Sequence, residues 1–133
     1  MQSKKPIYKK AFEPIDTYEE STWMGNDTPF METEYTGVFR DKYPCTPGHT
    51  LFIPKKNTPE YVGQSYGLAY EYGNNKVKEG KMMGFNVGMN IGLCAGQTIM
   101  WPHIHFIPRH EGDSEHHGGM RYAHPSADHN HYY

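Results

Sequence analysis

The stretch GQTIMWPHIHFIPR, residues 96–109, decides the fold prediction for this chain. Its centre alternates apolar and polar residues with a period of two, as in a half-buried β-strand. His103 and His105 project to one side of such a strand. Ile104 and Phe106 project to the other side. Two imidazoles on one strand face lie about 7 Å apart, given a rise of about 3.3 Å per residue, so a single phosphate group can touch both.

Taken alone, the HxH pattern allows three interpretations. The pair can be a polar surface or structural pair. It can also bind zinc, with His49, His110 or Asp41 as a third ligand after folding. The third interpretation is catalysis on phosphorus, because a neutral imidazole is a competent nucleophile. The preceding residues 95–98 offer backbone amides and a hydroxyl group to anionic oxygens.

Composition narrows the class of protein. The chain has 133 residues, enough for one domain with a buried core, and its net charge of −2 gives no support for a long nucleic-acid partner. No apolar run reaches the roughly 18 residues that a membrane span needs. The N-terminal lysines are not followed by an apolar region, so we expect no secretory signal. Two cysteines, Cys45 and Cys94, form no metal or disulfide pattern, and we expect a cytoplasmic protein.

The other elements follow from periodicity and turn residues. Thr58, Pro59 and Glu60 form a typical helix start. Glycines weaken the far end of this helix, where we expect fraying near residues 73–75. The expected elements are a hairpin of strands 30–34 and 37–41, a strand over 49–54, a helix over 59–78, a strand over 83–90 and the central strand. This order predicts an α+β domain with an antiparallel sheet of about five strands and one long helix. We expect a homodimer, which would cover an exposed face or edge.

We divide the chain into three parts. Residues 1–29 form an irregular N-terminal arm, with a short helical turn near residues 18–23 and aromatic residues that pack on the domain. Residues 30–122 form the folded domain. Residues 123–133 form a histidine-rich C-terminal tail, which solvated side chains explain better than a metal site.

Several blocks of the sequence, in order, resemble the histidine triad (HIT) family. They are GQTIMWPHIHFIPR with the following HEGD, the upstream VFRDKYPCTPGHTLFIPKK, the tripeptide NIG at 90–92, and GDSEHHGGMR at 112–121. The last block is similar to the tail of a bacterial branch described as diadenosine tetraphosphate hydrolase-like. The resemblance covers residues 30–122 and implies the histidine triad fold.

The resemblance also implies roles for individual residues. His103 falls on the family's nucleophile, which takes the nucleotidyl group, and His105 falls on the histidine that contacts the phosphates. Asp41 falls on the residue that binds the ribose hydroxyls. The remaining matched positions lie around the nucleotide: Phe39 and Leu51 at the base, Gln97 and Thr98 at the phosphates, and His49 and Asn90 beside the site.

Trp101 departs from the family pattern. It stands at the first triad position, so the motif is WPHIH. In the family, the backbone carbonyl of this position holds the nucleophile's other ring nitrogen. A tryptophan retains that carbonyl, so we expect His103 to keep its orientation.

These observations predict a hydrolase that cleaves a phosphoanhydride or phosphoramidate of a nucleotide, foremost a dinucleoside polyphosphate, through a nucleotidyl-histidine intermediate. The alternatives are a nucleotide-binding protein with little turnover and a nucleotidyltransferase to an acceptor other than water. The histidine chemistry needs no metal cofactor, although Mg²⁺ can accompany a polyphosphate substrate. We expect a nucleotide as the partner, with no long nucleic acid and no membrane.

Overall fold

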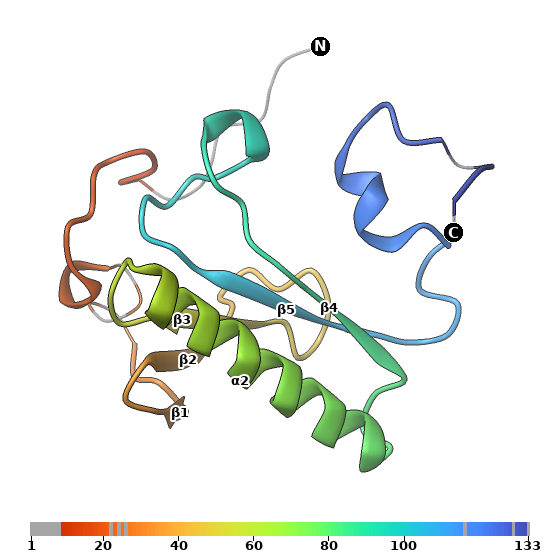
Figure 1. Ribbon diagram of the computed structural model, residues 1–133, viewed down its shortest axis with the longest axis horizontal. Helices are drawn as coiled ribbons and strands as arrows, with labels where there is room; N and C mark the ends of the chain where they lie inside the picture. The colour runs from red at the N-terminus through yellow and green to blue at the C-terminus, as the bar shows by residue number, and fades with distance from the viewer. Residues whose placement is uncertain are drawn as a thin grey trace.

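Five strands and one long helix form the framework of the computed structural model, which describes residues 9–21, 23, 25, 27–115, 117–128 and 130–132 (Figure 1). The elements are η1 (Tyr18–Glu20), β1 (Met31–Glu32), β2 (Thr36–Arg40), β3 (Thr50–Pro54), α2 (Pro59–Lys78), β4 (Gly84–Gly88), η2 (Leu93–Ala95), β5 (Ile104–Arg109) and η3 (Gly119–Ala123). The η elements are single turns of 3-10 helix.

The sheet is antiparallel throughout and has the strand order β1-β2-β3-β5-β4. The prediction of an α+β fold with a five-stranded antiparallel sheet and one long helix is therefore confirmed. The central sequence stretch forms β5, which lies between β3 and β4. His105 stands opposite Leu51 on one side and Gly88 on the other. His103 comes just before β5, at the end of the sheet where the strand begins.

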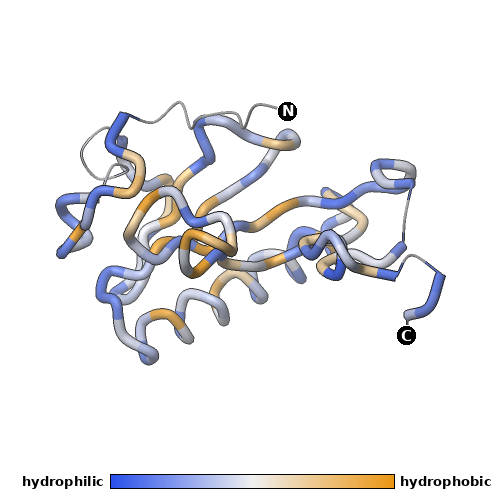
Figure 2. Tube along the Cα trace, turned by 90° about the horizontal axis from the view of Figure 1, so that it is seen from above, coloured by the Kyte–Doolittle hydropathy of each residue, from blue (hydrophilic) through white to orange (hydrophobic). Residues whose placement is uncertain are grey.

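The two faces of the sheet are covered by different parts of the chain. One face packs against α2 through a buried cluster of Val38, Phe52, Ala69, Ile104 and Phe106. The opposite face carries a second cluster, formed by Tyr18, Phe39, Leu51, Ile53 and Trp101. Figure 2 shows the coils of the long helix along one side of the molecule. The strict alternation along β2, β3 and β5 separates these clusters, because successive side chains point to opposite faces.

Helix α2 spans the predicted residues, Pro59–Lys78, without the expected fraying. The Thr58 hydroxyl accepts a hydrogen bond from the Tyr61 N–H at 3.3 Å, and Pro59 occupies the first helical position. The prediction of fraying near residues 73–75 is wrong, since the helix runs to Lys78. Gly73 is buried beneath the ring of Phe85, where a larger side chain would collide with that ring. Tertiary packing thus outweighs the low helix propensity of glycine.

The described residues of the N-terminal arm pack on the rest of the chain. The predicted helical turn starts with η1, although Thr22 lies outside the described residues. Tyr18 of this turn is buried in the second cluster, and its hydroxyl lies against Gly37, where any Cβ atom would collide with it. Upstream, the Phe12 N–H donates to the Thr98 carbonyl at 2.7 Å. The arm therefore contacts both the sheet and the loop that leads to His103.

Among the described residues, no helix combines the length and the apolar character needed to cross a membrane.

Candidate functional site

His103 and His105 meet at one cavity on the sheet face opposite α2. The cavity has a volume of about 480 Å³, and both imidazoles line it together with Asp41, His49 and Leu51. The ring centroids of the two histidines are 5.2 Å apart. The prediction that these two side chains share one face is confirmed, because Ile104 between them is buried on the other side.

The backbone of the first triad position orients His103. The Nδ1–H of His103 donates to the carbonyl oxygen of Trp101 at 2.7 Å, since a carbonyl can only accept. Neutral His103 therefore carries its free electron pair on Nε2. His103 is only 6% exposed, and this burial lowers its pKa, against the opposing effects of the Trp101 hydrogen bond and the Asp41 charge. A buried, neutral imidazole with a free Nε2 is the form that a nucleophile requires.

The side chain of Trp101 has a structural role at this position. It is buried in the second cluster, and its Nε1–H donates to the Pro54 carbonyl at the end of β3, at 2.9 Å. Where the family pattern has an imidazole, this chain has a hydrogen-bonded core residue. The carbonyl of the same residue still accepts from His103, as the sequence predicted.

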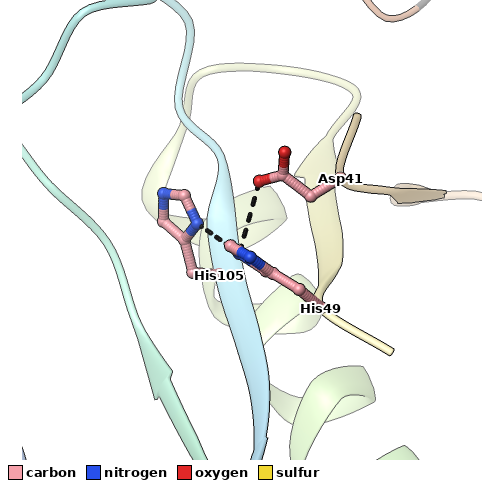
Figure 3. A group of neighbouring side chains, drawn as sticks. All are labelled: Asp41, His49 and His105. Carbon is pink, nitrogen blue, oxygen red and sulfur yellow. Dashed lines mark hydrogen bonds and ion pairs between the residues drawn. The ribbon is translucent and has the colours of Figure 1, made fainter. Parts of the chain in front are cut away.

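His49 fixes the proton position on His105. The backbone N–H of Cys45 donates to Nδ1 of His49 at 3.1 Å, so neutral His49 carries its proton on Nε2. That Nε2 lies 2.9 Å from Nδ1 of His105 and 3.3 Å from a carboxylate oxygen of Asp41 (Figure 3). When His49 donates to His105, neutral His105 keeps its own proton on Nε2. His105 then presents an N–H donor, whereas His103 presents an electron pair.

Electrostatics keeps these imidazoles neutral. Burial, followed by the neighbouring His103 and His49, lowers the pKa of His105 to about 4, against the opposing effect of the Asp41 charge. Burial also lowers the pKa of His49, although the Asp41 carboxylate opposes this effect. At neutral pH the site therefore holds uncharged histidines beside one carboxylate.

Asp41, His49 and His105 also form the one group in the described part of the chain whose atoms converge as metal ligands would, within 4.8 Å of one another. The hydrogen bonds, however, do not favour a metal ion there. A metal bound to Nε2 of neutral His49 would move the proton to Nδ1, which faces the Cys45 N–H donor. Metal binding would therefore require the loss of that hydrogen bond.

Asp41 is held in a position that suits a hydroxyl ligand. One of its carboxylate oxygens accepts the backbone N–H of Tyr43 at 2.8 Å, while the other faces His49. Its side chain remains 16% exposed toward the cavity it lines. A carboxylate oxygen has further lone pairs, so Asp41 can still accept hydrogen bonds from vicinal hydroxyl groups.

The loop before β5 places the other predicted phosphate ligands differently. Thr98 and Asn90 line the cavity, as does Gly96. Gln97 instead stabilises the loop: its Oε1 accepts the Gly92 N–H at 2.9 Å and its Nε2 donates to the Ile99 carbonyl at 3.0 Å. It lines a second cavity of about 420 Å³ near the start of α2. Its contact with a phosphate oxygen stays a prediction.

The two predicted base-pocket residues occupy different depths. Leu51 lines the cavity, whereas Phe39 is 1% exposed and lies in the second cluster behind it. Phe39 supports the wall, and a direct contact between its ring and a base stays a prediction.

The sequence interpretation missed six residues that line the cavity: Trp23, Asp27, Arg40, Lys42, Tyr43 and Ile99. Trp23 is one of the arm's aromatic residues, which were expected to pack on the domain, and its ring lies against His103 with a centroid distance of 4.8 Å. Asp27 also comes from the arm, and Lys42 and Tyr43 follow Asp41 directly. The available signal in the sequence was the position of Lys42 and Tyr43 directly after Asp41.

Two arginines and the described tail histidines do not line this cavity. Arg109 forms an ion pair with Asp113 at 2.9 Å and donates to Asn86, so it stabilises the end of the sheet. Arg121 donates to the carbonyl of His131. Among the described residues, the tail histidines do not gather into a group of three metal ligands; His116 and His129 lie outside that part.

Comparison with known proteins decides the family. The HIT domain family matches residues 25–112, which is most of the chain. The chain belongs to the HIT domain family. This match includes the whole sheet, α2 and the cavity residues of the Asp41 and His103 blocks.

Individual relatives agree with this assignment. An uncharacterised HIT-like protein from Methanocaldococcus jannaschii is 32% identical over 90 residues, which cover 63% of this chain and 70% of that protein. The asymmetrical bis(5'-nucleosyl)-tetraphosphatase of Schizosaccharomyces pombe is 29% identical over 91 residues, covering 63% of this chain and half of the relative. The structure of a zinc-bound histidine triad family protein from Mycobacterium smegmatis has a TM-score of 0.58 and 32% identity, covering 63% and 66% of the two chains. These HIT proteins therefore share the fold of this chain and include a nucleotide hydrolase.

Proposed function

We propose that this protein hydrolyses a phosphoanhydride or phosphoramidate bond of a nucleotide, foremost a dinucleoside polyphosphate, through a nucleotidyl intermediate on His103. The observation that supports this proposal most strongly is the opposite proton arrangement of the two histidines. His103 has a free Nε2 toward the cavity, and His105 keeps an Nε2–H donor beside it. One imidazole is suited to attack phosphorus, and the other to stabilise the oxygens around it.

The reaction has two balanced steps. In the first, the electron pair of His103 Nε2 forms a bond with the α-phosphorus, and the bond from phosphorus to the leaving phosphate oxygen breaks. The His105 N–H donates to a phosphoryl oxygen while the charge shifts to the leaving group. In the second step, water attacks the same phosphorus, the P–N bond breaks, and a proton is released. The products are the leaving group released in the first step, a nucleoside monophosphate released in the second, and free His103.

The surrounding residues suit the rest of the nucleotide. Asp41 accepts the ribose hydroxyls, and Thr98 with the nearby backbone amides binds phosphate oxygens. The histidine chemistry requires no metal ion, while Mg²⁺ can accompany the polyphosphate as part of the substrate. We also infer that the protein is cytoplasmic. We further infer a homodimer, because β4 is an edge strand that a second copy can cover.

The test is nucleotide release from diadenosine and diguanosine tetraphosphate by the purified protein. We expect turnover in the wild type and a loss of at least about a thousandfold in His103→Ala. Glu71→Gln, on the exposed side of α2, is a matched surface control and should retain full activity. Intact mass spectrometry after rapid acid-free quenching should detect one nucleotidyl group on the wild type.

Two results would contradict the hydrolase proposal. Tight nucleotide binding without turnover above His103→Ala would identify a binding protein. Formation of a new nucleotidyl product in the presence of phosphate or a sugar phosphate, at the expense of the monophosphate, would identify a transferase.

A further inference from the structure

Asp27 and Lys42 line the cavity, carry opposite charges and have no ion-pair partner in the described part of the chain. Arg40 also lines the cavity, but its guanidinium donates to the Thr50 hydroxyl and lies over the Phe30 ring. Asp27 comes from the N-terminal arm, and Lys42 follows Asp41. Both are exposed. The Lys42 ammonium lies over the ring of Tyr43, 5.9 Å from its centroid. These charges stabilise no other described element by an ion pair, so they remain available to a ligand.

Asp27 is positioned on the same side of the arm as Trp23. The N–H of Asp27 donates to the Trp23 carbonyl at 2.8 Å, which is the hydrogen bond of one helical turn, so the two side chains project in the same direction. One carboxylate oxygen of Asp27 accepts the Thr28 N–H at 2.9 Å, which limits its rotation. The other oxygen, and the remaining lone pairs of both, can accept further hydrogen bonds.

The order of groups in a nucleotide places its base near these residues. This step rests on the proposed function, with the phosphates at His103 and His105 and the ribose at Asp41. The base then lies beyond the ribose. The cavity offers this base the apolar residues Leu51 and Ile99 and the aromatic residues Trp23 and Tyr43. Because Arg40 is held by Thr50 and Phe30, the charged side chains left to contact the base are Asp27 and Lys42. Aromatic faces accept any base by stacking, so we assign the distinction between bases to the charged pair Asp27 and Lys42.

The chemistry of the pair matches guanine better than the other bases. On its Watson–Crick edge, guanine carries two adjacent donors, N1–H and the N2 amino group, beside the O6 acceptor. A carboxylate accepts from both donors, and a lysine donates to O6 or N7. Adenine offers one donor next to the N1 acceptor, which repels a carboxylate oxygen. Uracil offers a single donor between two acceptors.

We propose that this cavity selects guanine nucleotides, with the Asp27 carboxylate accepting hydrogen bonds from N1–H and N2 and the Lys42 ammonium donating to O6 or N7. Trp23 and Tyr43 contribute stacking surfaces that hold the base without distinguishing it. The preferred substrate class is therefore a guanylyl phosphoanhydride or phosphoramidate. Asp27 and Lys42 determine specificity and take no part in bond cleavage.

Calorimetric titration with nucleoside monophosphates tests this proposal without any turnover. We expect the wild type to bind GMP about tenfold more tightly than AMP, with IMP, which lacks the N2 amino group, between them. Asp27→Asn should lose this preference and gain affinity for XMP, because its amide donates to the xanthine O2 while its carbonyl accepts N1–H. A gain of affinity cannot come from partial unfolding. Glu71→Gln is the matched control and should behave as the wild type.

Equal affinities of the wild type for GMP and AMP would overturn the proposal, as would an equal loss of both in Asp27→Asn without a gain for XMP. These results are separate from those of the hydrolysis test. Turnover of diadenosine and diguanosine tetraphosphate at the same kcat/KM would overturn base selection and leave the hydrolase in place. GMP selectivity without turnover would have the opposite meaning.

Discussion

The Nδ1–H of His103 donates to the backbone carbonyl of Trp101, two residues earlier, across 2.7 Å. This contact fixes which ring nitrogen is free, and it depends on the main chain of the first triad position rather than on its side chain. The Trp101 indole donates a hydrogen bond to the Pro54 carbonyl and packs in the second cluster. Orientation of the nucleophile and stability of the fold thus originate from different atoms of one residue.

Replacement of Trp101 by phenylalanine should separate these two roles. Trp101→Phe keeps the carbonyl but leaves the buried Pro54 carbonyl without its indole donor. We expect a loss of about 1–3 kcal/mol in the free energy of unfolding, measured by urea denaturation. The kcat for nucleotide release should stay within about threefold of the wild type, well under 1 kcal/mol in the barrier. A much larger fall in kcat, with the fold intact by circular dichroism, would show that the indole itself takes part in the chemistry.

His49 should control the proton position on His105, and two amide variants distinguish the halves of its ring. His49→Gln places an N–H₂ donor near the former Nε2, whereas His49→Asn places only an acceptor near the former Nδ1. We expect His49→Asn to lower kcat by about tenfold to a hundredfold, as is usual when a residue that orients a functional histidine is lost. His49→Gln should retain more activity. Long-range ¹H–¹⁵N spectra report the tautomer directly: His105 should be protonated on Nε2 in the wild type and mixed in His49→Asn. An unchanged tautomer in His49→Asn would contradict this assignment.

The lowered histidine pKa values should make stability depend on pH below neutrality. The His105 pKa is about 4 in the folded chain, while an unfolded histidine titrates near 6.5. Between these values the unfolded state binds more protons, so the free energy of unfolding rises with pH and is lost as pH falls from about 6.5 to 4. For His105 the loss is on the order of 3 kcal/mol. Urea denaturation across this range should show a decline that His105→Gln reduces. A flat profile in the wild type would contradict it.

The pH dependence of kcat/KM should also reflect the lowered histidine pKa values. Because burial lowers the pKa of His103, its Nε2 stays unprotonated at pH values where a solvent-exposed histidine would be charged. The acidic limb of kcat/KM should therefore lie below pH 6.5. An acidic limb at or above the ordinary histidine pKa would indicate that His103 is charged in the free protein.

The buried hydroxyl group of Tyr18 should lower the free energy of unfolding. It is buried and has no hydrogen-bond partner among the described residues, and burial, followed by Glu32 and Glu19, raises its pKa to about 12. Tyr18→Phe removes the unsatisfied hydroxyl but keeps the ring in the cluster. We expect a gain of about 1 kcal/mol in the free energy of unfolding. Glu19 and Glu32 remain in both proteins, so a loss of stability would mean that the hydroxyl has a favourable interaction.

The edge strand β4 should pair two copies of the chain. Within the described residues β4 pairs only with β5, which leaves its outer edge to a partner. Light scattering coupled to size-exclusion chromatography should give twice the chain mass of 15.4 kDa. A single-chain mass at all protein concentrations would rule out the homodimer.

The sequence was sufficient to predict the features that depend on local periodicity and spacing. The alternation around His103 and His105 and the Thr58–Pro59 helix start are local signals, and both were confirmed. The gathering of Asp41, His49 and His105 depends on the register of β3 against β5, which periodicity alone does not specify.

The predictions that were wrong or incomplete concern contacts between residues far apart in the sequence. The helix does not fray at Gly73, because Phe85 of another element packs against this residue. Trp23 reaches His103 because the arm folds back over the sheet. Single-sequence patterns contain no information about either contact, since each partner is more than ten residues away.

The carbonyl of Trp101 has a consequence for how relatives of this chain are recognised. A motif written as three histidines describes side chains, but one of its three positions acts here through an atom that every amino acid possesses. Evolution can therefore exchange the residue at that position for another that suits the local packing while the nucleophile stays oriented. Searches that demand an imidazole there will exclude chains of this kind, and a search based on the main-chain path into the strand and two histidines will retain them.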